Sequence, residues 1–438
     1  MPTRLLVVGN GAREHALAWK LAAEPGVNAV IVAPGRDVMA NEPRVRTVRL
    51  EPLDPEAVVA LARAQAVEVV VVGPEAPLAT GVADALTAAG VPVFGPSAAA
   101  ARIETSKGFC REVAGAAGIP MAEGRAFGAD ERGAAISFAR QLVDRTGGAV
   151  IKADGLAAGK GVTVCTSADE AEVAVDALDG RVVVEERLVG REASVIALSD
   201  GADAIALPIS RDHKRLGDGD TGPNTGGMGA YSPLPDLPDD AADEIVERFH
   251  RPALAELARR GTPFRGALYA GLMLTDRGPR LLEFNARFGD PETQVIVPRL
   301  AVALGPLLLA AARGSLADAR RAYGSLVPAL PTATVGIVLA SKGYPNQIEP
   351  GAEITALDDA GRLSDEPDVL VFHAGSARGP DGRFRATGGR VLTVVGRGAD
   401  LGAARGAAER AADRVAWPGS ERRHDIAGEA ATLAGASA

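Results

Sequence analysis

Short apolar runs that alternate with helical stretches constrain the first hundred residues most strongly. Residues 5–9 (Leu-Leu-Val-Val-Gly) carry no polar side chain, as expected of a strand buried on both faces. Further strands are predicted over residues 29–33, 67–72 and 91–94. Helices are predicted over residues 14–22, 55–65 and 78–89. This alternation predicts a parallel β-sheet with its ligands at the carboxyl ends of the strands.

The composition limits the class of protein. At 438 residues the chain exceeds one ordinary domain, so two or three are expected. A formal charge of −9 argues against a nucleic-acid or anionic-membrane surface, and no apolar run reaches the roughly 18 residues of a membrane span. The two cysteines, Cys110 and Cys165, cannot build a disulfide framework. The chain starts with a strand and not a signal peptide, so we expect a cytoplasmic protein with no nucleic-acid or membrane partner.

The remaining chain divides into two further α/β regions. We expect a Rossmann-like domain over residues 1–103, a central domain over 104–325 and a small α+β domain over 326–438. Helices are predicted over residues 105–117, 132–143, 239–260, 298–313 and 401–415. Strands are predicted over residues 149–152, over the pair 182–186 and 192–198, and over 334–339, 369–373 and 389–395. The polar, glycine-rich segment 212–229 is expected to be irregular, and such a segment is more often functional than idle.

A glycine-rich turn between two lysines is the main candidate for nucleotide binding. It reads Ile151-Lys-Ala-Asp-Gly-Leu-Ala-Ala-Gly-Lys-Gly-Val162. Lys152 ends an apolar strand, where an unpaired charge would be costly. Lys160 lies between Gly159 and Gly161. Together with Lys107, the two lysines suit the phosphates of ATP; any one of them alone is more often a solvated surface residue.

A downstream strand carries candidate metal ligands. Glu283 and Asn285 are two residues apart in Leu281-Leu-Glu-Phe-Asn-Ala-Arg287, and so lie on one face of the strand. Such an oxygen pair suits a Mg²⁺ ion that bridges phosphates. Arg287, predicted on the same face, is suited to steady a transferring phosphoryl group. A solvated strand face is the competing interpretation, and the flanking apolar residues argue against it.

The first strand runs directly into Gly9-Asn-Gly-Ala-Arg-Glu-His15, which opens a helix. Backbone N–H groups at such a helix start can hold a phosphate. NAD binding is not expected, because Pro34-Gly35-Arg36 stands where a dinucleotide site has an acid. Glu75, after the third strand, is suited to accept from a sugar hydroxyl, although an ordinary turn carboxylate is an equal interpretation.

Two more polar clusters follow. In Glu185-Glu-Arg-Leu-Val-Gly-Arg-Glu192, the strand backbone can contact an adenine edge while Glu192 accepts from ribose hydroxyls. Solvated acids are a credible alternative, chiefly for Glu186. The segment Arg211-Asp-His-Lys-Arg215, with Asn224-Thr-Gly-Gly-Met-Gly229, can bind an amino acid, with Asp212 facing its ammonium group.

Taken together, these segments resemble the ATP-grasp superfamily and, within it, the phosphoribosylamine–glycine ligase family. The similarity covers nearly the whole chain. It is carried by the motifs above and by Val72-Gly-Pro-Glu-Ala-Pro-Leu78, Asp220-Thr-Gly-Pro-Asn-Thr-Gly-Gly-Met-Gly-Ala-Tyr-Ser-Pro233, Tyr269-Ala-Gly-Leu-Met273, Arg287-Phe-Gly-Asp-Pro-Glu-Thr-Gln294 and Phe372-His-Ala-Gly375.

The resemblance implies a central ATP-grasp domain with a nucleotide-covering subdomain at about residues 120–187. It implies ATP-dependent joining of glycine to 5-phosphoribosylamine through a glycyl phosphate in purine biosynthesis, by a monomer that uses Mg²⁺ or Mn²⁺. The implied catalytic residues are Arg287, Lys160 and Asp212, and the implied metal ligands are Glu283 and Asn285. The implied nucleotide-binding residues are Lys107, Lys152, Gly159, Lys160, Gly161, Glu185, Glu186 and Glu192. The implied substrate-binding residues are Gly9, Asn10, Gly11, Arg13, Glu14, Glu75, Asp212, Lys214, Gly226, Gly227 and Arg287.

The sequence departs from the family pattern in three ways. Arg36-Asp-Val38 replaces a customary Asn-Ala-Gly, the segment 176–181 is shorter than usual, and alanines stand at 12 and 286 in place of glycine and cysteine. Ala12 requires a negative φ at that position. Two other functions stay open: a diverged paralogue that joins a different amino acid or amine, and a non-catalytic ATP-binding protein, against which the retained lysines argue.

Overall fold

The first sheet is parallel, as predicted. In the computed structural model, which describes residues 1–156 and 161–436, its strand order is β3-β2-β1-β4-β5, with every neighbouring pair parallel. Apart from Arg4, β1 and β4 are buried, which explains their uniformly apolar sequences. The short strand β3 lies outside the predicted set. The strands are β1 (Arg4–Gly9), β2 (Ala29–Pro34), β3 (Val45–Thr47), β4 (Val69–Val72) and β5 (Val93–Phe94).

The helices of this region differ from prediction at one point. The expected helix over residues 78–89 is divided, because Gly81 has φ +86° and takes the left-handed conformation that interrupts a helix. Ala12 begins the first helix and keeps the negative φ that an alanine requires there. The helices are α1 (Ala12–Ala22), α2 (Pro55–Ala64), α3 (Glu75–Ala79) and α4 (Val82–Ala88).

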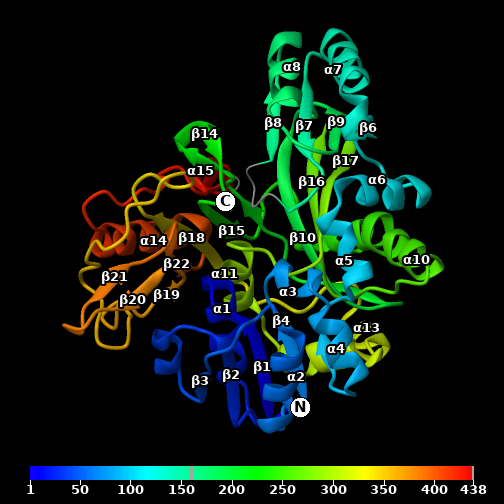
Figure 1. Ribbon diagram of the computed structural model, residues 1–438. Helices are drawn as coiled ribbons and strands as arrows, with labels where there is room; N and C mark the ends of the chain where they lie inside the picture. The colour runs from blue at the N-terminus through cyan, green and yellow to red at the C-terminus, as the bar shows by residue number, and fades with distance from the viewer. Residues whose placement is uncertain (157–160, 437–438) are drawn as a thin grey trace.

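The central region contains two antiparallel sheets. The larger has the order β11-β10-β16-β17, and the smaller the order β6-β9-β7-β8, with α7 and α8 beside it at the top of Figure 1. The prediction that 182–186 and 192–198 pair with each other was wrong, since β9 and β10 belong to different sheets. The strands are β6 (Gly124–Phe127), β7 (Ala149–Ala153), β8 (Val162–Cys165), β9 (Val182–Glu186), β10 (Arg191–Asp200), β11 (Ala204–Ala206), β16 (Arg265–Thr275) and β17 (Gly278–Asn285).

Helices surround these sheets, and none of those described is long and apolar enough to cross a membrane. The predicted helix over 298–313 begins only at Gly305. The residues before it form a short helical turn, Val297–Arg299, which ends because Leu300 has an extended backbone. The predicted helix over 239–260 is present as α9, a π-helical turn (Val246–His250) and α10. The helices are α5 (Ala98–Thr105), α6 (Lys107–Ala116), α7 (Arg132–Thr146), α8 (Ala168–Asp176), α9 (Ala242–Ile245), α10 (Arg251–Arg259), α11 (Glu292–Ile296), α12 (Gly305–Arg313) and α13 (Ala317–Tyr323).

A third sheet combines strands from the middle and the end of the chain. Its order is β12-β15-β18-β22-β19, and it therefore includes strands from both sides of residue 326. The predicted strands over 334–339, 369–373 and 389–395 and the predicted helix over 401–415 are confirmed. The elements are β12 (Arg211–Asp212), β15 (Gly229–Ser232), β18 (Ala333–Ala340), β19 (Val369–His373), β22 (Arg390–Gly398) and α14 (Leu401–Val415); the hairpin β20 (Ser376–Arg378) and β21 (Phe384–Ala386) and the helix α15 (Gly428–Ala436) lie outside the predicted set.

The segment 212–229 is more regular than predicted. It contains the antiparallel hairpin of β13 (Arg215–Gly217) and β14 (Thr221–Asn224). Polar contacts hold this hairpin: Arg423 Nη1 donates to Asp220 Oδ1 at 2.6 Å, and Gly219 N donates to Asp425 Oδ2 at 2.8 Å. Because the hairpin is stabilised by these contacts and not by an apolar face, its sequence lacks the alternation that identifies a strand.

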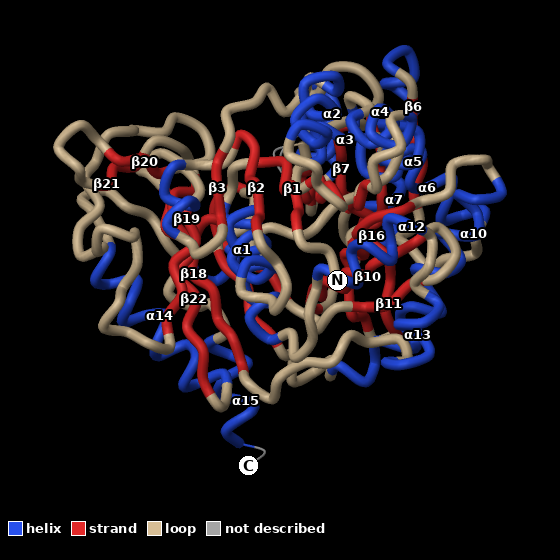
Figure 2. Tube along the Cα trace, turned by 90° about the horizontal axis from the view of Figure 1, so that it is seen from below, coloured by secondary structure: helices blue, strands red, loops and turns tan. Residues whose placement is uncertain are grey.

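The small sheet has a core of its own. Phe127, Leu142, Ile151 and Val184 belong to an apolar cluster confined to this sheet and its two helices. The parallel sheet, the larger central sheet and the third sheet share one large apolar cluster. Within it, α1 contacts both the parallel sheet and β19, and Figure 2 shows α1 between these strands. The small sheet is thus the part of the described structure that is least tied to the rest.

Glu24 links the end of α1 to α12. Its buried carboxylate accepts hydrogen bonds from Leu304 N and from Gly305 N, the latter at 2.9 Å, and so caps the helix start of α12. We expect Glu24→Ala to lower the free energy of unfolding by about 1–3 kcal/mol, because two buried N–H groups lose their acceptor. Urea denaturation measures this change. The exposed substitution Glu56→Ala serves as the control and is expected to change stability by less than about 0.5 kcal/mol; equal effects of the two would refute the capping role.

Candidate active site

A cavity of about 1380 Å³ collects most of the predicted site residues. Its walls come from the parallel-sheet region, both central sheets and the third sheet. Gly9, Asn10, Gly11, Glu14 and Gly227 do not line it, and Gly159 and Lys160 lie outside the described residues. The predicted residues that line it are Arg13, Glu75, Lys107, Lys152, Gly161, Glu185, Glu186, Glu192, Asp212, Lys214, Gly226, Glu283, Asn285 and Arg287.

Two of the predicted lysines are held in fixed positions. Lys107 Nζ donates to Gly155 O at 3.0 Å. Lys152 Nζ donates to Leu282 O at 3.0 Å and lies 2.6 Å from Glu185 Oε2. Arg111 Nη1 is 2.6 Å from the other oxygen of Glu185, so this carboxylate is engaged by two cations. Glu185 therefore supports Lys152 directly.

The two other predicted acids of this region have different environments. Glu186 accepts from Glu123 N at 2.9 Å through its side chain. Glu192 Oε2 lies 2.7 Å from Lys214 Nζ, and both side chains are partly exposed to the cavity. Gly161, which follows the undescribed residues, accepts from Ala153 N at 2.7 Å through its carbonyl.

The candidate metal ligands lie at the end of β17, as predicted. Asn285 Nδ2 is 3.4 Å from Glu283 Oε1, so the two side chains adjoin. Burial disfavours the charge of Glu283, but Lys214, Lys152 and Lys107 together lower the pKa of its carboxyl to about 2. An ionised carboxylate beside an amide oxygen fits Mg²⁺, which commonly takes one or two protein oxygens and completes its shell with water and phosphate. In the described ranges there is no group of three or more histidines, cysteines or acids that could hold a metal by itself.

Arg287 lies just beyond β17 and not within the strand, so the prediction of a continuous alternating face was wrong at this residue. Arg287 Nη2 is 3.1 Å from Glu104 Oε1, and its Nε is 3.5 Å from Glu75 Oε2. Burial disfavours the guanidinium charge, but Glu104 and Glu75 raise the pKa of Arg287 above its ordinary value. Burial also favours the neutral form of Glu75, yet Arg287 and Arg13 hold the pKa of Glu75 below its usual value.

Asp212 is the predicted acid with the most unusual environment. Its Oδ1 atom is buried without a hydrogen-bond partner. Burial raises the pKa of Asp212 well above its ordinary value, and the nearby carboxylates of Glu292, Glu192 and Glu283 add to the increase against the attraction of Lys214. An unsatisfied acid at a cavity wall is suited to a cationic or hydrogen-bond-donating ligand.

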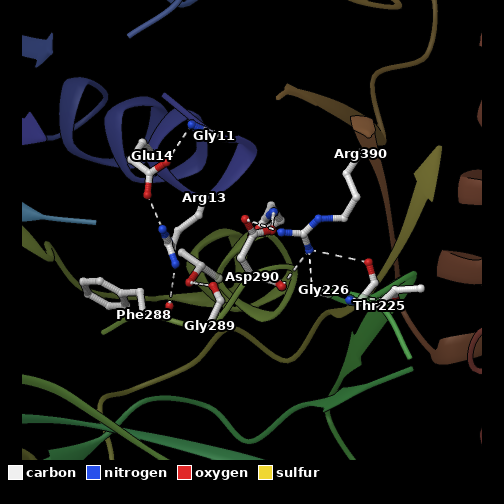
Figure 3. Close-up of polar contacts among 12 residues, drawn as sticks. Gly11, Arg13, Glu14, Thr225, Gly226, Phe288, Gly289, Asp290 and Arg390 are labelled. Carbon is white, nitrogen blue, oxygen red and sulfur yellow. Dashed lines mark hydrogen bonds and ion pairs between the residues drawn. The ribbon is translucent and has the colours of Figure 1, made fainter. Parts of the chain in front are cut away.

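At the predicted helix start of α1, Glu14 accepts from Gly11 N at 2.7 Å and from Arg13 Nε at 2.5 Å (Figure 3). Arg13 Nη1 donates to Phe288 O at 3.1 Å, so the helix start is joined to the chain that follows β17. A Cβ atom on Gly73 would lie 2.1 Å from Glu14 Oε1, and a glycine is therefore required there to make room for the carboxylate.

The predicted glycines 226 and 227 are held by the third sheet. Arg390 Nη1 donates to Gly226 O at 2.6 Å, and Arg390 Nη2 lies 3.0 Å from Asp290 Oδ2 (Figure 3). The Tyr344 hydroxyl accepts from Gly226 N at 3.0 Å. This arrangement brings the glycine segment, the chain after β17 and the third sheet together at one end of the cavity.

Several cavity residues lie outside the predicted set, among them Glu104, Tyr344 and Arg390. Glu104 had one available indication, a carboxylate on the otherwise apolar side of helix α5. The departure at Arg36 has a structural role: its Nε donates to Asn10 O at 3.1 Å and its Nη1 to Ser376 O at 3.5 Å. Arg36 therefore connects the loop before α1 to β20 and does not line the cavity.

The chain is similar to curated ligases over nearly its whole length. It is 47% identical over 430 residues to the phosphoribosylamine–glycine ligase of Streptomyces coelicolor, covering 98% of this chain and 99% of the relative. It is 44% identical over 436 residues to that of Agrobacterium fabrum, covering 98% of each. The crystal structure of phosphoribosylamine–glycine ligase from Thermotoga maritima matches with a TM-score of 0.78 and 33% identity, covering 97% of this chain and 100% of that one. The biotin carboxylase domain of Hydrogenobacter thermophilus 2-oxoglutarate carboxylase shares the fold alone, with a TM-score of 0.67 at 16% identity over 96% of this chain and 92% of that one.

Family models match three consecutive regions of the chain and agree with these relatives. Those described as phosphoribosylglycinamide synthetase match as the N domain over residues 3–104, the ATP-grasp (A) domain over 105–293 and the C domain over 334–429. The predicted α/β fold with a central ATP-grasp domain and the predicted ligase class are thereby confirmed. The chain belongs to the phosphoribosylamine–glycine ligase family.

Proposed function

We propose that this protein joins glycine to 5-phosphoribosylamine and forms glycinamide ribonucleotide, ADP and phosphate in purine biosynthesis. The family assignment supports the reaction, and one observation in the site carries it: Glu283, Lys107, Lys152 and Lys214 line the same cavity, and the three lysines lower the pKa of Glu283. Alternating positive and negative groups of this kind suit a polyphosphate with its divalent cation.

Lys107 and Lys152 are proposed to bind the phosphates of ATP, together with Lys160 and glycines 159 and 161 of the loop. Glu283 and Asn285 are proposed to hold Mg²⁺ or Mn²⁺, which would neutralise phosphate charge when bound. Glu185 holds Lys152 by the 2.6 Å ion pair, and Glu192 and Glu186 lie at the cavity wall where a nucleoside would bind.

Asp212 is proposed to bind the ammonium group of glycine through its unpaired Oδ1. One oxygen of the glycine carboxylate attacks the γ-phosphorus of ATP, the bond to the ADP oxygen breaks, and glycyl phosphate forms. The 1-amino group of phosphoribosylamine then attacks the acyl carbon, loses a proton and displaces phosphate. Arg287 is proposed to stabilise the charge that develops on the transferring oxygens, so catalysis depends on positioning and electrostatics.

Phosphoribosylamine is proposed to bind at the end of the cavity formed by Arg13, Glu75 and Gly226. Gly9, Asn10, Gly11, Glu14 and Gly227 do not line the cavity, and we propose that they assist this site from outside it, Gly11 and Glu14 through the bonds that join them to Arg13. Closure of the small sheet, which has a separate core, is proposed to exclude water from the acyl phosphate. We further propose that the protein acts on these small molecules as a monomer in the cytoplasm.

The reaction itself is tested by ADP release from the purified protein with ATP, Mg²⁺, glycine and phosphoribosylamine generated in place. We expect ADP only when all components are present, and glycinamide ribonucleotide in the products by mass spectrometry. ADP release with another amino acid or amine, and none with glycine, would identify a diverged paralogue. Absence of turnover with every acceptor would leave a protein that only binds ATP.

The metal site is tested by Glu283→Gln. Loss of the ionised ligand is expected to lower kcat/KM for ATP by at least about 100-fold at saturating Mg²⁺, because the neutral amide binds the cation weakly. Glu172→Gln, at a partly exposed position on α8 where the side chain pairs with Arg140 outside the cavity, is the control and should act like the unsubstituted protein. Unchanged kcat/KM in Glu283→Gln would contradict the assignment. Chelation of the metal should abolish activity, and added Mg²⁺ or Mn²⁺ should restore it.

The glycine site is tested by pH dependence. Burial raises the pKa of Asp212, so its carboxyl group is protonated at low pH. Only the deprotonated carboxylate can bind the ammonium group of glycine. We therefore expect kcat/KM for glycine to rise with pH over a range well above the ordinary pKa of an aspartate. Asp212→Asn should lower kcat/KM for glycine about 10- to 100-fold and remove this rise. The exposed control Asp179→Asn should keep it; a rise that persists in Asp212→Asn would exclude this residue.

A further inference from the structure

Arg287 has two acidic partners that differ in how firmly they hold it. Glu104 Oε1 lies 3.1 Å from Arg287 Nη2, whereas Glu75 Oε2 lies 3.5 Å from Nε, beyond hydrogen-bond geometry. Arg287 Nε is accordingly a buried nitrogen without a hydrogen-bond partner. Both terminal nitrogens are bound within the protein, Nη2 by Glu104 and Nη1 by Phe288 O at 3.2 Å, and Nε alone lacks a hydrogen bond.

The Glu104 carboxylate is itself fixed by the backbone. It lies on α5 with a side chain that is only 6% exposed, and its second oxygen accepts from Ala286 N at 2.8 Å. Glu104 thus also binds the backbone of Ala286, the residue that directly precedes Arg287. Glu75, by contrast, has a side chain that is 33% exposed at the cavity, and it starts the short helix α3. Glu104 holds both the backbone and the side chain of this segment, while Glu75 contacts the side chain alone.

We propose that Glu104 is a positioning residue for the ligase reaction: it fixes the guanidinium of Arg287 and the backbone at Ala286, and so leaves the more exposed Glu75 for the substrates. This inference rests on the proposed function. A guanidinium that must meet a transferring oxygen loses most of its effect when it is misplaced by about 1 Å. An arginine side chain has several rotatable bonds, so a fixed acceptor that restricts them maintains the required geometry.

The test compares Glu104→Gln with the unsubstituted protein. The amide keeps the shape of the carboxylate but lacks its charge and can offer only one acceptor atom to the two donors. We expect kcat for glycinamide ribonucleotide formation to fall about 10- to 100-fold, with KM for ATP changed less than about twofold, because the phosphate-binding lysines are untouched. Glu104→Asp, which keeps the charge on a shorter side chain, is expected to retain more activity than Glu104→Gln and serves as the second variant should the amide fail to fold.

A double-mutant cycle separates positioning from general damage. If Glu104 acts through Arg287, Glu104→Gln should lower kcat by less than about twofold in an Arg287→Lys background, where the contact between Glu104 Oε1 and the guanidinium Nη2 is already lost. Multiplication of the two single effects would overturn the proposal, because it would mean that Glu104 acts independently of Arg287.

Glu24→Gln is the matched control, since Glu24 is also a buried carboxylate that accepts backbone N–H groups but lies outside the cavity. It should lower the urea midpoint and leave kcat unchanged. If Glu104 had only a structural role, Glu104→Gln would likewise lower the urea midpoint and leave kcat unchanged. That result would refute the proposal. Glycinamide ribonucleotide formation by the unsubstituted protein is measured alongside, so failure of the proposed function is recognised separately.

Discussion

The attraction between Glu283 and the lysines around it is the interaction on which the site depends. Lys214 Nζ lies 3.9 Å from Glu283 Oε1, and Lys152 and Lys107 add a longer-range attraction that lowers the pKa of this carboxyl against the effect of burial. Lys152 is balanced a second time by Glu185, and Lys214 by Glu192. The protein's charges in the cavity are therefore balanced in the absence of a nucleotide, and the phosphates and their cation can exchange for these internal partners.

The architecture explains how these groups meet. The third sheet combines β12 and β15 with three strands from the end of the chain, so Asp212 and Gly226 are fixed relative to Arg390. Helix α1 contacts both this sheet and the parallel sheet, and Arg13 joins its start to the chain after β17. The small sheet contributes Lys152 but has its own core. The other cavity walls are consequently connected to one another, whereas the small sheet is suited to move.

Sequence patterns predicted the structure correctly where interactions between neighbouring residues determine it. Continuous apolar runs identified β1, β2 and β4, and the alternation in Glu283-Phe-Asn285 located the end of β17 in the cavity. The sequence-based predictions failed where contacts between residues far apart in the sequence determine the structure. The hairpin of β13 and β14 is held by Arg423 and Asp425, and β9 and β10 separate into different sheets although they adjoin in sequence. Likewise, no local pattern pairs Glu104 with Arg287. That contact joins residues almost two hundred positions apart, and only the fold creates it.

The central claim is that the glycine carboxylate becomes an acyl phosphate before the amine attacks. Transfer of oxygen tests it most directly: glycine labelled with ¹⁸O in its carboxyl group is turned over with ATP and phosphoribosylamine, and the released phosphate is analysed by mass spectrometry. The account predicts one ¹⁸O atom in each phosphate, because the carboxylate oxygen that attacks the γ-phosphorus leaves with it. Phosphate free of label, released together with glycinamide ribonucleotide, would contradict the account and require a route without glycyl phosphate.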